Sequence, residues 1–243
     1  MRRRLAIIPA RGGSKRIPRK NIRSFCGKPI LAYSIETALN SGLFNEVMVS
    51  TDDAEISRVA LRYGAKVPFM RSAETSNDLA GLADVVLEVL QTYEGLGMAF
   101  DEVCCLLPTA PLLIQSDLAE GLSLLTAGQY ETVFPVVQFS YPIQRALSLS
   151  GSRASMIWPE NYSARSQDLP STYHDCGQFY WMRTPAIRQE KKLFTKNSGA
   201  LVLPETRVQD IDSEEDWKLC ELKYSMLEPA SDDLRETSGS GCL

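Results

Sequence analysis

The chain has 243 residues, of which 44% are hydrophobic and 23% charged, and its formal net charge is −4. This length allows one sizeable core, and we expect a single domain over residues 1–228. No apolar run approaches the roughly 18 residues of a membrane helix, and the Met-Arg-Arg-Arg start runs into a strand without a signal-peptide apolar region, so we expect a cytoplasmic protein with no membrane partner.

Positive charge is concentrated at the start of the chain. Residues 1–35 hold ten of the 26 Lys and Arg and no Asp or Glu, whereas the remaining residues carry 16 basic and 30 acidic side chains. An acidic protein with its cations gathered in one short stretch is typical of a local anion site. The distribution disfavours a broad basic face for nucleic acid.

A glycine-containing loop follows the first apolar run, Leu5 to Ile8, which predicts a buried strand. The loop has five cations between Arg11 and Lys20, and Gly12, Gly13 and Ser14 lie at its turn. It matches neither the Walker pattern nor the dinucleotide fingerprint. Backbone N–H groups and positive side chains can nevertheless converge here on one small volume, which suits a polyphosphate.

This loop resembles the signature loop of the sugar nucleotidyltransferases. Its form is similar to that of the cytidylyltransferases that activate sialic-acid-like nine-carbon sugars, and Gly27 to Leu31 fits the same family. The resemblance implies an α/β, three-layer Rossmann-like nucleotidyltransferase fold with a mainly parallel sheet and a small dimerisation insertion. It also implies that the loop wraps the phosphates of CTP, with nucleotide contacts from Ala10, Arg11, Gly12, Gly13, Ser14, Lys15, Lys20 and Asn21.

Strands and helices are predicted to alternate after the loop, which indicates a parallel sheet. Asp52 and Glu55 form a plausible capping pair for one of the helices. The predicted strands are Glu46 to Thr51, Lys66 to Met70, Glu102 to Leu107 and Thr132 to Phe139; the predicted helices run from Pro29 towards Gly42, from Asp52 to Gly64, through Val85 to Leu90, and from Ser116 to Ala127.

An irregular polar stretch begins at Arg71 and includes Asp78. In related enzymes an arginine followed by a polar loop approaches the cytosine and the ribose. The resemblance therefore implies base or sugar contacts for Arg71 and Asp78. A solvated connection explains the same polarity, because loops are polar in general.

The run Glu102 to Leu107 suits the middle of a covered sheet, and the rigid turn after it contains Thr109 between two prolines. Open α/β sheets bind ligands at such strand ends. Family members that act on sialic acid usually carry a glutamine before the first proline, where this chain has Leu107. The resemblance implies that Leu107 and Thr109 contact the sugar, and that an apolar contact replaces a polar one.

Residues 140–177 form an excursion from the sheet with a small hairpin or arm, because several prolines interrupt it. In the family this insertion reaches over a neighbouring subunit and completes its site, which implies a homodimer. The block Tyr173 to Trp181 is similar to that of family members that act on pseudaminic acid. The sugar contacts implied in this region are Arg165, as partner of the carboxylate, with Gln167, His174, Asp175 and Gln178.

A pair of aspartates, Asp210 and Asp212, lies near the end of the chain. Strand periodicity would place both carboxylates on one side, where they can reach one hard cation, and together with the phosphate loop they predict a Mg²⁺ site. Alone, the pair could merely acidify the start of the helix that Ser213 and Asp216 are predicted to cap. We expect residues 229–243 to be a disordered tail.

The resemblance covers about residues 4 to 228 and implies transfer of CMP from CTP to the anomeric hydroxyl of a nine-carbon sugar acid, with release of pyrophosphate. It implies Arg11, Lys20 and Asp212 as catalytic residues and pseudaminic acid as the sugar. The same reaction on N-acetylneuraminic or legionaminic acid remains an alternative. Two alternatives from other classes are a glycosyltransferase that uses the aspartate pair and a non-catalytic nucleotide-binding protein.

Overall fold

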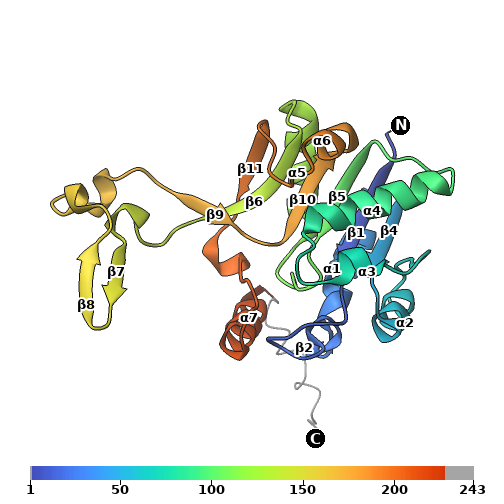
Figure 1. Cartoon of the computed structure of the whole chain (residues 1–243), viewed down its shortest axis with the longest axis horizontal. Coiled ribbons are helices and arrows are strands. Elements are labelled where there is room, and N and C mark those ends of the chain that lie inside the picture. Colours follow the sequence, from blue (N-terminus) through green and yellow to red (C-terminus); the bar gives the residue numbers. More distant parts are fainter. Residues whose placement is uncertain (1, 228–243) are drawn as a thin grey trace, which may run out of the picture.

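A seven-stranded mixed sheet forms the centre of the molecule, which is described over residues 2–227 by a computed structural model (Figure 1). The strand order is β11-β6-β10-β5-β1-β4, and β9 pairs with β6. Parallel pairing joins β4, β1 and β5 and joins β6 to β11, whereas β10 and β9 run antiparallel to their neighbours. The strands are β1 (Arg4–Pro9), β4 (Glu46–Ser50), β5 (Glu102–Leu106), β6 (Thr132–Gln138), β9 (Tyr173–Asp175), β10 (Phe179–Arg183) and β11 (Ser198–Val202).

Helices cover both faces of this sheet, because its central strands are apolar on both sides. The core on one face joins the sheet to α1, α2 and α5, and the core on the other face joins it to α4 and α6. The predicted three-layer α/β architecture is therefore present. The helices are α1 (Ile30–Asn40), α2 (Ala54–Arg62), α3 (Ala73–Ser76), α4 (Leu82–Gly95), α5 (Gln115–Ala127), α6 (Thr184–Glu190) and α7 (Glu214–Leu227).

The register of the parallel strands places their carboxyl ends at one edge of the sheet. Ile7 of β1 lies opposite Met48 of β4 and Cys105 of β5. All five residues of β5 are buried, which confirms the prediction of a central strand. The glycine loop after β1 and the proline turn after β5 consequently begin side by side.

A third apolar cluster fixes the end of the chain to its beginning. The cluster contains Ile17 of the loop, Phe25, Ile211, and Trp217 of α7. Phe25 belongs to the short strand β2 (Ser24–Phe25), which pairs with β3 (Lys28–Pro29). Phe25 and Trp217 meet edge to face with 5.5 Å between ring centroids. This packing carries residues 210–212 to the glycine loop although about 190 positions separate them in the sequence.

Three local predictions were wrong. Residues 66–70 form only one bridge, Met48 to Lys66, because Pro68 has no N–H to continue a ladder. The cap of α2 is Asp53, which accepts from the backbone N–H groups of Glu55 and Ile56, and is not Asp52. Residues 208–213 have no strand conformation.

The excursion between β6 and β10 projects from the sheet as an arm (Figure 1). It contains a two-stranded hairpin, β7 (Leu147–Ser150) with β8 (Arg153–Met156), in which seven of the eight residues are exposed. No helix within residues 2–227 is long and apolar enough to cross a membrane. The predicted tail, residues 229–243, lies outside the described part of the chain.

Candidate active site

A cleft of about 540 Å³ lies at the carboxyl ends of β1 and β5. It brings together ten of the predicted site residues from both ends of the sequence. The cleft is lined by Arg11, Ser14, Lys15, Lys20 and Asn21 of the glycine loop, Asp78, Leu107, Thr109, Asp210 and Asp212, together with Pro9, Arg16, Leu82 and Pro108.

Lys20 joins the glycine loop to the aspartate pair. Its Nζ donates to the carbonyl of Ile211 at 2.6 Å and lies 3.9 Å from Oδ1 of Asp212. Burial lowers the pKa of Lys20, and the nearby charge of Asp212 opposes this shift. Lys20 is therefore held by protein groups on one side while it also faces the cleft.

Asp210 and Asp212 flank the buried Ile211, and both line the cleft although the segment is not a strand. Partial burial and the charge of Asp212 raise the pKa of Asp210. Arg16, which was not among the predicted site residues, forms an ion pair with Asp212. The reciprocal bonds between Ser213 and Asp216 confirm the predicted capping box at the start of α7.

The donor set at this pair fits magnesium. Mg²⁺ in proteins is commonly bound by one or two carboxylates together with substrate phosphates and waters. Within residues 2–227 there is no group of three or more His, Cys, Asp or Glu that would form an all-protein metal site. Two carboxylates next to a phosphate loop agree with an ion shared between protein and substrate.

Internal hydrogen bonds hold the glycine loop. Asn21 donates to the carbonyl of Arg11 at 2.9 Å, the Gly12 N–H donates to Asp52 at 2.9 Å, and the Ser14 N–H donates to the Gly12 carbonyl at 3.1 Å. Two of the three backbone donors expected to bind phosphate are thus engaged within the protein. Asp52 is a loop residue that the sequence did not reveal in this role, since its position suggested a helix cap.

Glycine is present at positions 12 and 13 of the loop for different structural reasons. Neither Gly12 nor Gly13 has a positive φ, so the turn itself does not require glycine. A Cβ at Gly12 would lie 2.7 Å from Oδ2 of Asp53, whereas a Cβ at Gly13 would meet nothing within 4 Å. Asp53 is held as the cap of α2 and by Arg19, so Gly12 is required for close packing.

Arg11 and Lys15 both contact Asp78 across the cleft. Arg11 Nη1 lies 2.7 Å from Oδ1 of Asp78, and Lys15 Nζ lies 2.5 Å from Oδ2. Lys15 and, to a smaller extent, Arg11 lower the pKa of the Asp78 carboxyl. The Asp78 side chain therefore faces the loop cations that were predicted to bind phosphate.

Ala10 and Arg71 lie behind the cleft and do not line it. Ala10 is buried, and its N–H donates to the carbonyl of Ser50 at 2.9 Å. Arg71 is also buried and donates to the carbonyl and hydroxyl oxygens of the same Ser50. Burial lowers the pKa of Arg71. Both residues thus fix the end of β4 beside the loop.

Leu107 directly follows β5, Gln178 directly precedes β10, and the two residues are neighbours. The Leu107 N–H donates to the Gln178 carbonyl at 2.8 Å. Gln178 is buried, and its Nε2 donates to the carbonyl of Arg207 at 2.6 Å. Its Oε1 is buried without a hydrogen-bond partner within the described residues, which is uncommon for a buried amide oxygen.

His174 lies in a separate hollow of about 190 Å³ at the base of the arm, with Gln209 and Lys223 in its lining. The ring of His174 packs against Phe139 with 4.7 Å between centroids. Asp175 accepts from the hydroxyl of Tyr180 at 2.5 Å, and burial followed by this bond raises the Tyr180 pKa. His174 and Asp175 are therefore near the arm and outside the lining of the main cleft.

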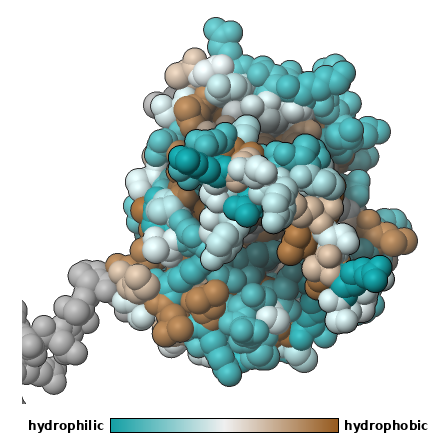
Figure 2. Space-filling view, turned by 90° about the vertical axis from the view of Figure 1, so that its left-hand side faces the viewer, coloured by the Kyte–Doolittle hydropathy of each residue, from teal (hydrophilic) through white to brown (hydrophobic). Residues whose placement is uncertain are grey.

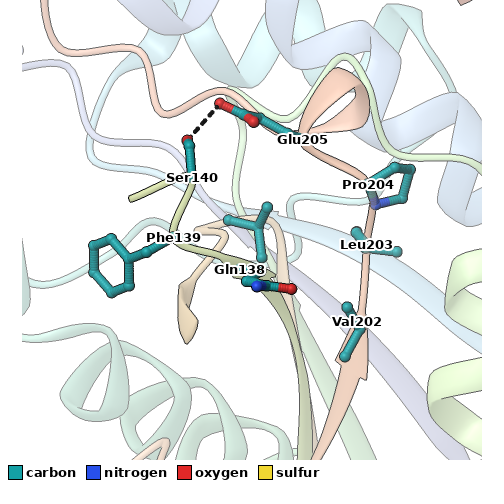
Figure 3. Close-up of a pocket in the computed structure, with 8 residues that line it drawn as sticks. Gln138, Phe139, Ser140, Val202, Leu203, Pro204 and Glu205 are labelled. Atoms are coloured by element: carbon teal, nitrogen blue, oxygen red, sulfur yellow. Dashed lines mark hydrogen bonds between the residues drawn. The ribbon is translucent and has the colours of Figure 1, made fainter. Parts of the chain in front are cut away.

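A second hollow of about 420 Å³ adjoins this region, between the ends of β6 and β11 (Figure 3). Ser140 donates to Glu205 at 3.1 Å across it, and Phe139 points away from the other labelled side chains. Arg165 and Gln167 are further out, at the 3-10 turn Ser166–Asp168 of the arm. The structure does not bring these two residues to the cleft of the same chain.

Comparisons with known proteins show the family to which the chain belongs. A family model described as "Cytidylyltransferase" matches residues 5–196. The chain belongs to the cytidylyltransferase family. The pseudaminic acid cytidylyltransferase of Campylobacter jejuni is 45% identical over 91% of this chain and 96% of its own length.

Two further matches are a more distant relative by sequence and a solved structure with the same fold. The CMP-N,N'-diacetyllegionaminic acid synthase of Legionella pneumophila is 32% identical over 89% of this chain and 94% of that protein. The fold matches a solved CMP:2-keto-3-deoxy-manno-octonic acid synthetase complexed with CTP, with a TM-score of 0.66 at 18% identity; the match covers 92% of this chain and 99% of that one. At this identity the structural match supports the fold alone.

Proposed function

We propose that this protein transfers CMP from CTP to the anomeric hydroxyl of pseudaminic acid and releases pyrophosphate. The observation that carries this proposal is the single cleft in which Lys20 of the glycine loop meets Asp212 near the end of the chain. A cationic loop and a carboxylate pair are the groups that nucleotidyl transfer needs. The 45% identity to a pseudaminic acid cytidylyltransferase supports the choice of sugar.

The reaction is an in-line attack of the sugar hydroxyl on the α-phosphorus, so no covalent enzyme intermediate is required. Arg11, Lys15 and Lys20 bind the phosphate oxygens and neutralise the charge that develops on the pyrophosphate leaving group. Lys20 is best placed for this role, because its bond to the Ile211 carbonyl fixes the ammonium at the edge of the cleft. Gly13 leaves room for a phosphate to approach the backbone.

Asp210 and Asp212 would hold magnesium, which supplies positive charge at the phosphates when it is bound. Arg16 pairs with Asp212, so this carboxylate already accepts a cationic partner at the place where it would hold the metal. Arg16 also lines the cleft, where its guanidinium can contact the substrate phosphates.

The sugar end of the cleft is proposed to lie at Leu107 and Thr109. Leu107 offers an apolar contact, which suits pseudaminic acid because this deoxy sugar ends in a methyl group. The unpaired Oε1 of Gln178, next to Leu107, would accept a hydrogen bond from an N–H or hydroxyl of the sugar. Thr109 supplies a hydroxyl at the same edge.

A homodimer is proposed from the composition of the arm. Leu147, Leu149, Tyr141, Tyr162 and Trp158 are all exposed on it. An isolated two-stranded hairpin is at best marginally stable, so this apolar surface needs a partner. Figure 2, which views the molecule from the arm side, shows several apolar patches among polar ones on this face.

The dimer also accounts for the sugar residues that lie away from the main cleft. The arm would carry Arg165 and Gln167 to the site of the other subunit, where the Arg165 guanidinium can engage both oxygens of the sugar carboxylate. His174 and Asp175, at the base of the arm, would lie between the two subunits. Residues 1–228 would form one domain in each subunit.

The reaction itself separates this proposal from the other classes. Purified protein with CTP and magnesium should release pyrophosphate only when a sugar acid is added. A glycosyltransferase would instead consume a nucleotide sugar, and a nucleotide sensor would bind CTP without turnover. Release of pyrophosphate without any sugar acid, or no release with the panel of pseudaminic, legionaminic and N-acetylneuraminic acids, would contradict the proposal.

A further inference from the structure

One carboxylate is held against two cations of the glycine loop. Asp78 lies on the connection between α3 and α4, and its two oxygens accept separately from Arg11 and Lys15 at 2.7 and 2.5 Å. The two segments are more than 60 residues apart in the chain, so the contact depends on the tertiary fold. Arg11 also donates to the carbonyl of Asn77 at 3.2 Å.

These cations are the ones that the proposed function assigns to the triphosphate. A carboxylate oxygen and a phosphate oxygen accept hydrogen bonds from the same N–H groups. A phosphate that takes the same N–H groups of Arg11 and Lys15 would therefore replace Asp78 there. The replacement costs the same free energy whichever phosphate ligand enters.

The strength of the contact determines which ligands can replace it. Asp78 is 49% exposed and Lys15 is 79% exposed, so each ion pair is weak on its own. A single phosphate gains little beyond what Asp78 already provides. A triphosphate also reaches Lys20, which has no contact with Asp78. The free energy of this additional contact offsets the cost of displacing Asp78.

We propose that Asp78 competes with phosphate for Arg11 and Lys15 and thereby sets how tightly the glycine loop binds phosphate ligands. It weakens every phosphate ligand by one common factor. Small anions then bind too weakly to occupy the site, whereas a triphosphate with its additional contacts still binds. This inference rests on the proposed function, because it assumes that the loop binds phosphate.

The experiment measures binding of inorganic pyrophosphate and of inorganic tripolyphosphate by calorimetry, without magnesium or nucleotide. Three proteins are compared: the unmodified full chain, Asp78→Asn and Glu74→Gln. Glu74 is a matched control, since it is an exposed acid on α3 of the same segment and makes no ion pair with the loop cations within residues 2–227. Thermal melting verifies that each variant is folded.

Asp78→Asn should bind both inorganic ligands more tightly by a similar factor, about 2- to 30-fold, which corresponds to the loss of two surface ion pairs. Glu74→Gln should change either affinity much less. The inference would be overturned if the two variants changed the affinities equally, or if Asp78→Asn bound the ligands more weakly. Either result would leave intact the proposal that the loop binds phosphate. No binding of either ligand by any of the three proteins would overturn both the inference and the proposed loop function.

Discussion

Lys20 donates a hydrogen bond of 2.6 Å to the carbonyl of Ile211 and thereby joins two segments that are 191 positions apart. Ile211 is fully buried in the cluster that also contains Ile17 and Trp217. The bond and the packing together set the distance between the phosphate loop and the aspartate pair. The cleft therefore depends on the docking of the segment before α7.

The protonation of Lys20 should determine how kcat/KM for CTP falls at high pH, the alkaline limb of the pH profile. Burial lowers its pKa below the ordinary value of 10.5, so the ammonium loses its proton at a lower pH than an exposed lysine would. Because the charged form binds phosphate, kcat/KM for CTP should fall as the pH rises through this lowered pKa. Lys20→Arg, which stays charged, should shift the limb to higher pH. Identical alkaline limbs in the two enzymes would exclude this role.

Asp212→Asn should reduce turnover by about 100-fold or more, because charge stabilisation by a bound metal contributes several kcal/mol. The variant should fold, since the Asp212 side chain is 46% exposed. Manganese binding, followed by electron paramagnetic resonance, should weaken in parallel. Glu215→Gln, which removes a nearby exposed carboxylate, serves as control. Near-normal turnover of Asp212→Asn at limiting magnesium would rule out the assignment.

The glycines of the loop should respond differently to the same substitution. Gly12→Ala should lower the stability by roughly 1–3 kcal/mol, because its Cβ meets the fixed Asp53 side chain. Gly13→Ala should leave the melting temperature unchanged and raise the KM for CTP, since only an approaching phosphate would contact the added carbon. The prediction is wrong if both variants have the same melting temperature, or if Gly13→Ala has the KM for CTP of the unmodified protein.

Leu149 of the arm is 73% exposed and should be buried by a second copy of the chain. Leu149→Glu should weaken self-association by about tenfold or more, because burying an unpaired charge is costly. Sedimentation velocity over a range of concentrations measures the effect. Leu96→Glu alters an exposed leucine at the end of α4 and should leave the assembly unchanged. A monomeric unmodified protein would refute the proposed dimer.

Leu107→Gln should narrow the preference for pseudaminic acid over N-acetylneuraminic acid by roughly tenfold, the scale of one net hydrogen bond. The new amide would offer a polar partner where the unmodified enzyme offers an apolar one. Leu107→Met keeps the apolar surface and should retain the preference. An unchanged ratio of kcat/KM values in Leu107→Gln would show that this position does not select the sugar.

The predicted parallel strand direction explains how part of the candidate site is formed. The loop after β1 and the turn after β5 meet because parallel strands end at one edge, and this follows from the alternation of strands and helices. The aspartate pair reached the cleft for another reason, since its segment is not a strand. A capping box at Ser213 and the apolar cluster around Trp217 position it.

Tertiary pairing explains what the sequence could not predict. Asp78 contacts Arg11 and Lys15, and Asp52 accepts from Gly12, only because distant segments pack together. A charge pattern along the chain does not show which acid faces which base. β10 was not among the predicted strands, because its first residues were assigned to the block Tyr173 to Trp181; its antiparallel direction follows from its pairing with β5.

The most direct test of the account is the ratio of kcat/KM for two sugar acids, with pyrophosphate release from CTP as the readout. Unmodified enzyme with magnesium should use pseudaminic acid far better than N-acetylneuraminic acid, because Leu107 cannot pair with a polar group of the second sugar. Equal use of both acids, or a preference for N-acetylneuraminic acid, would contradict the proposed specificity.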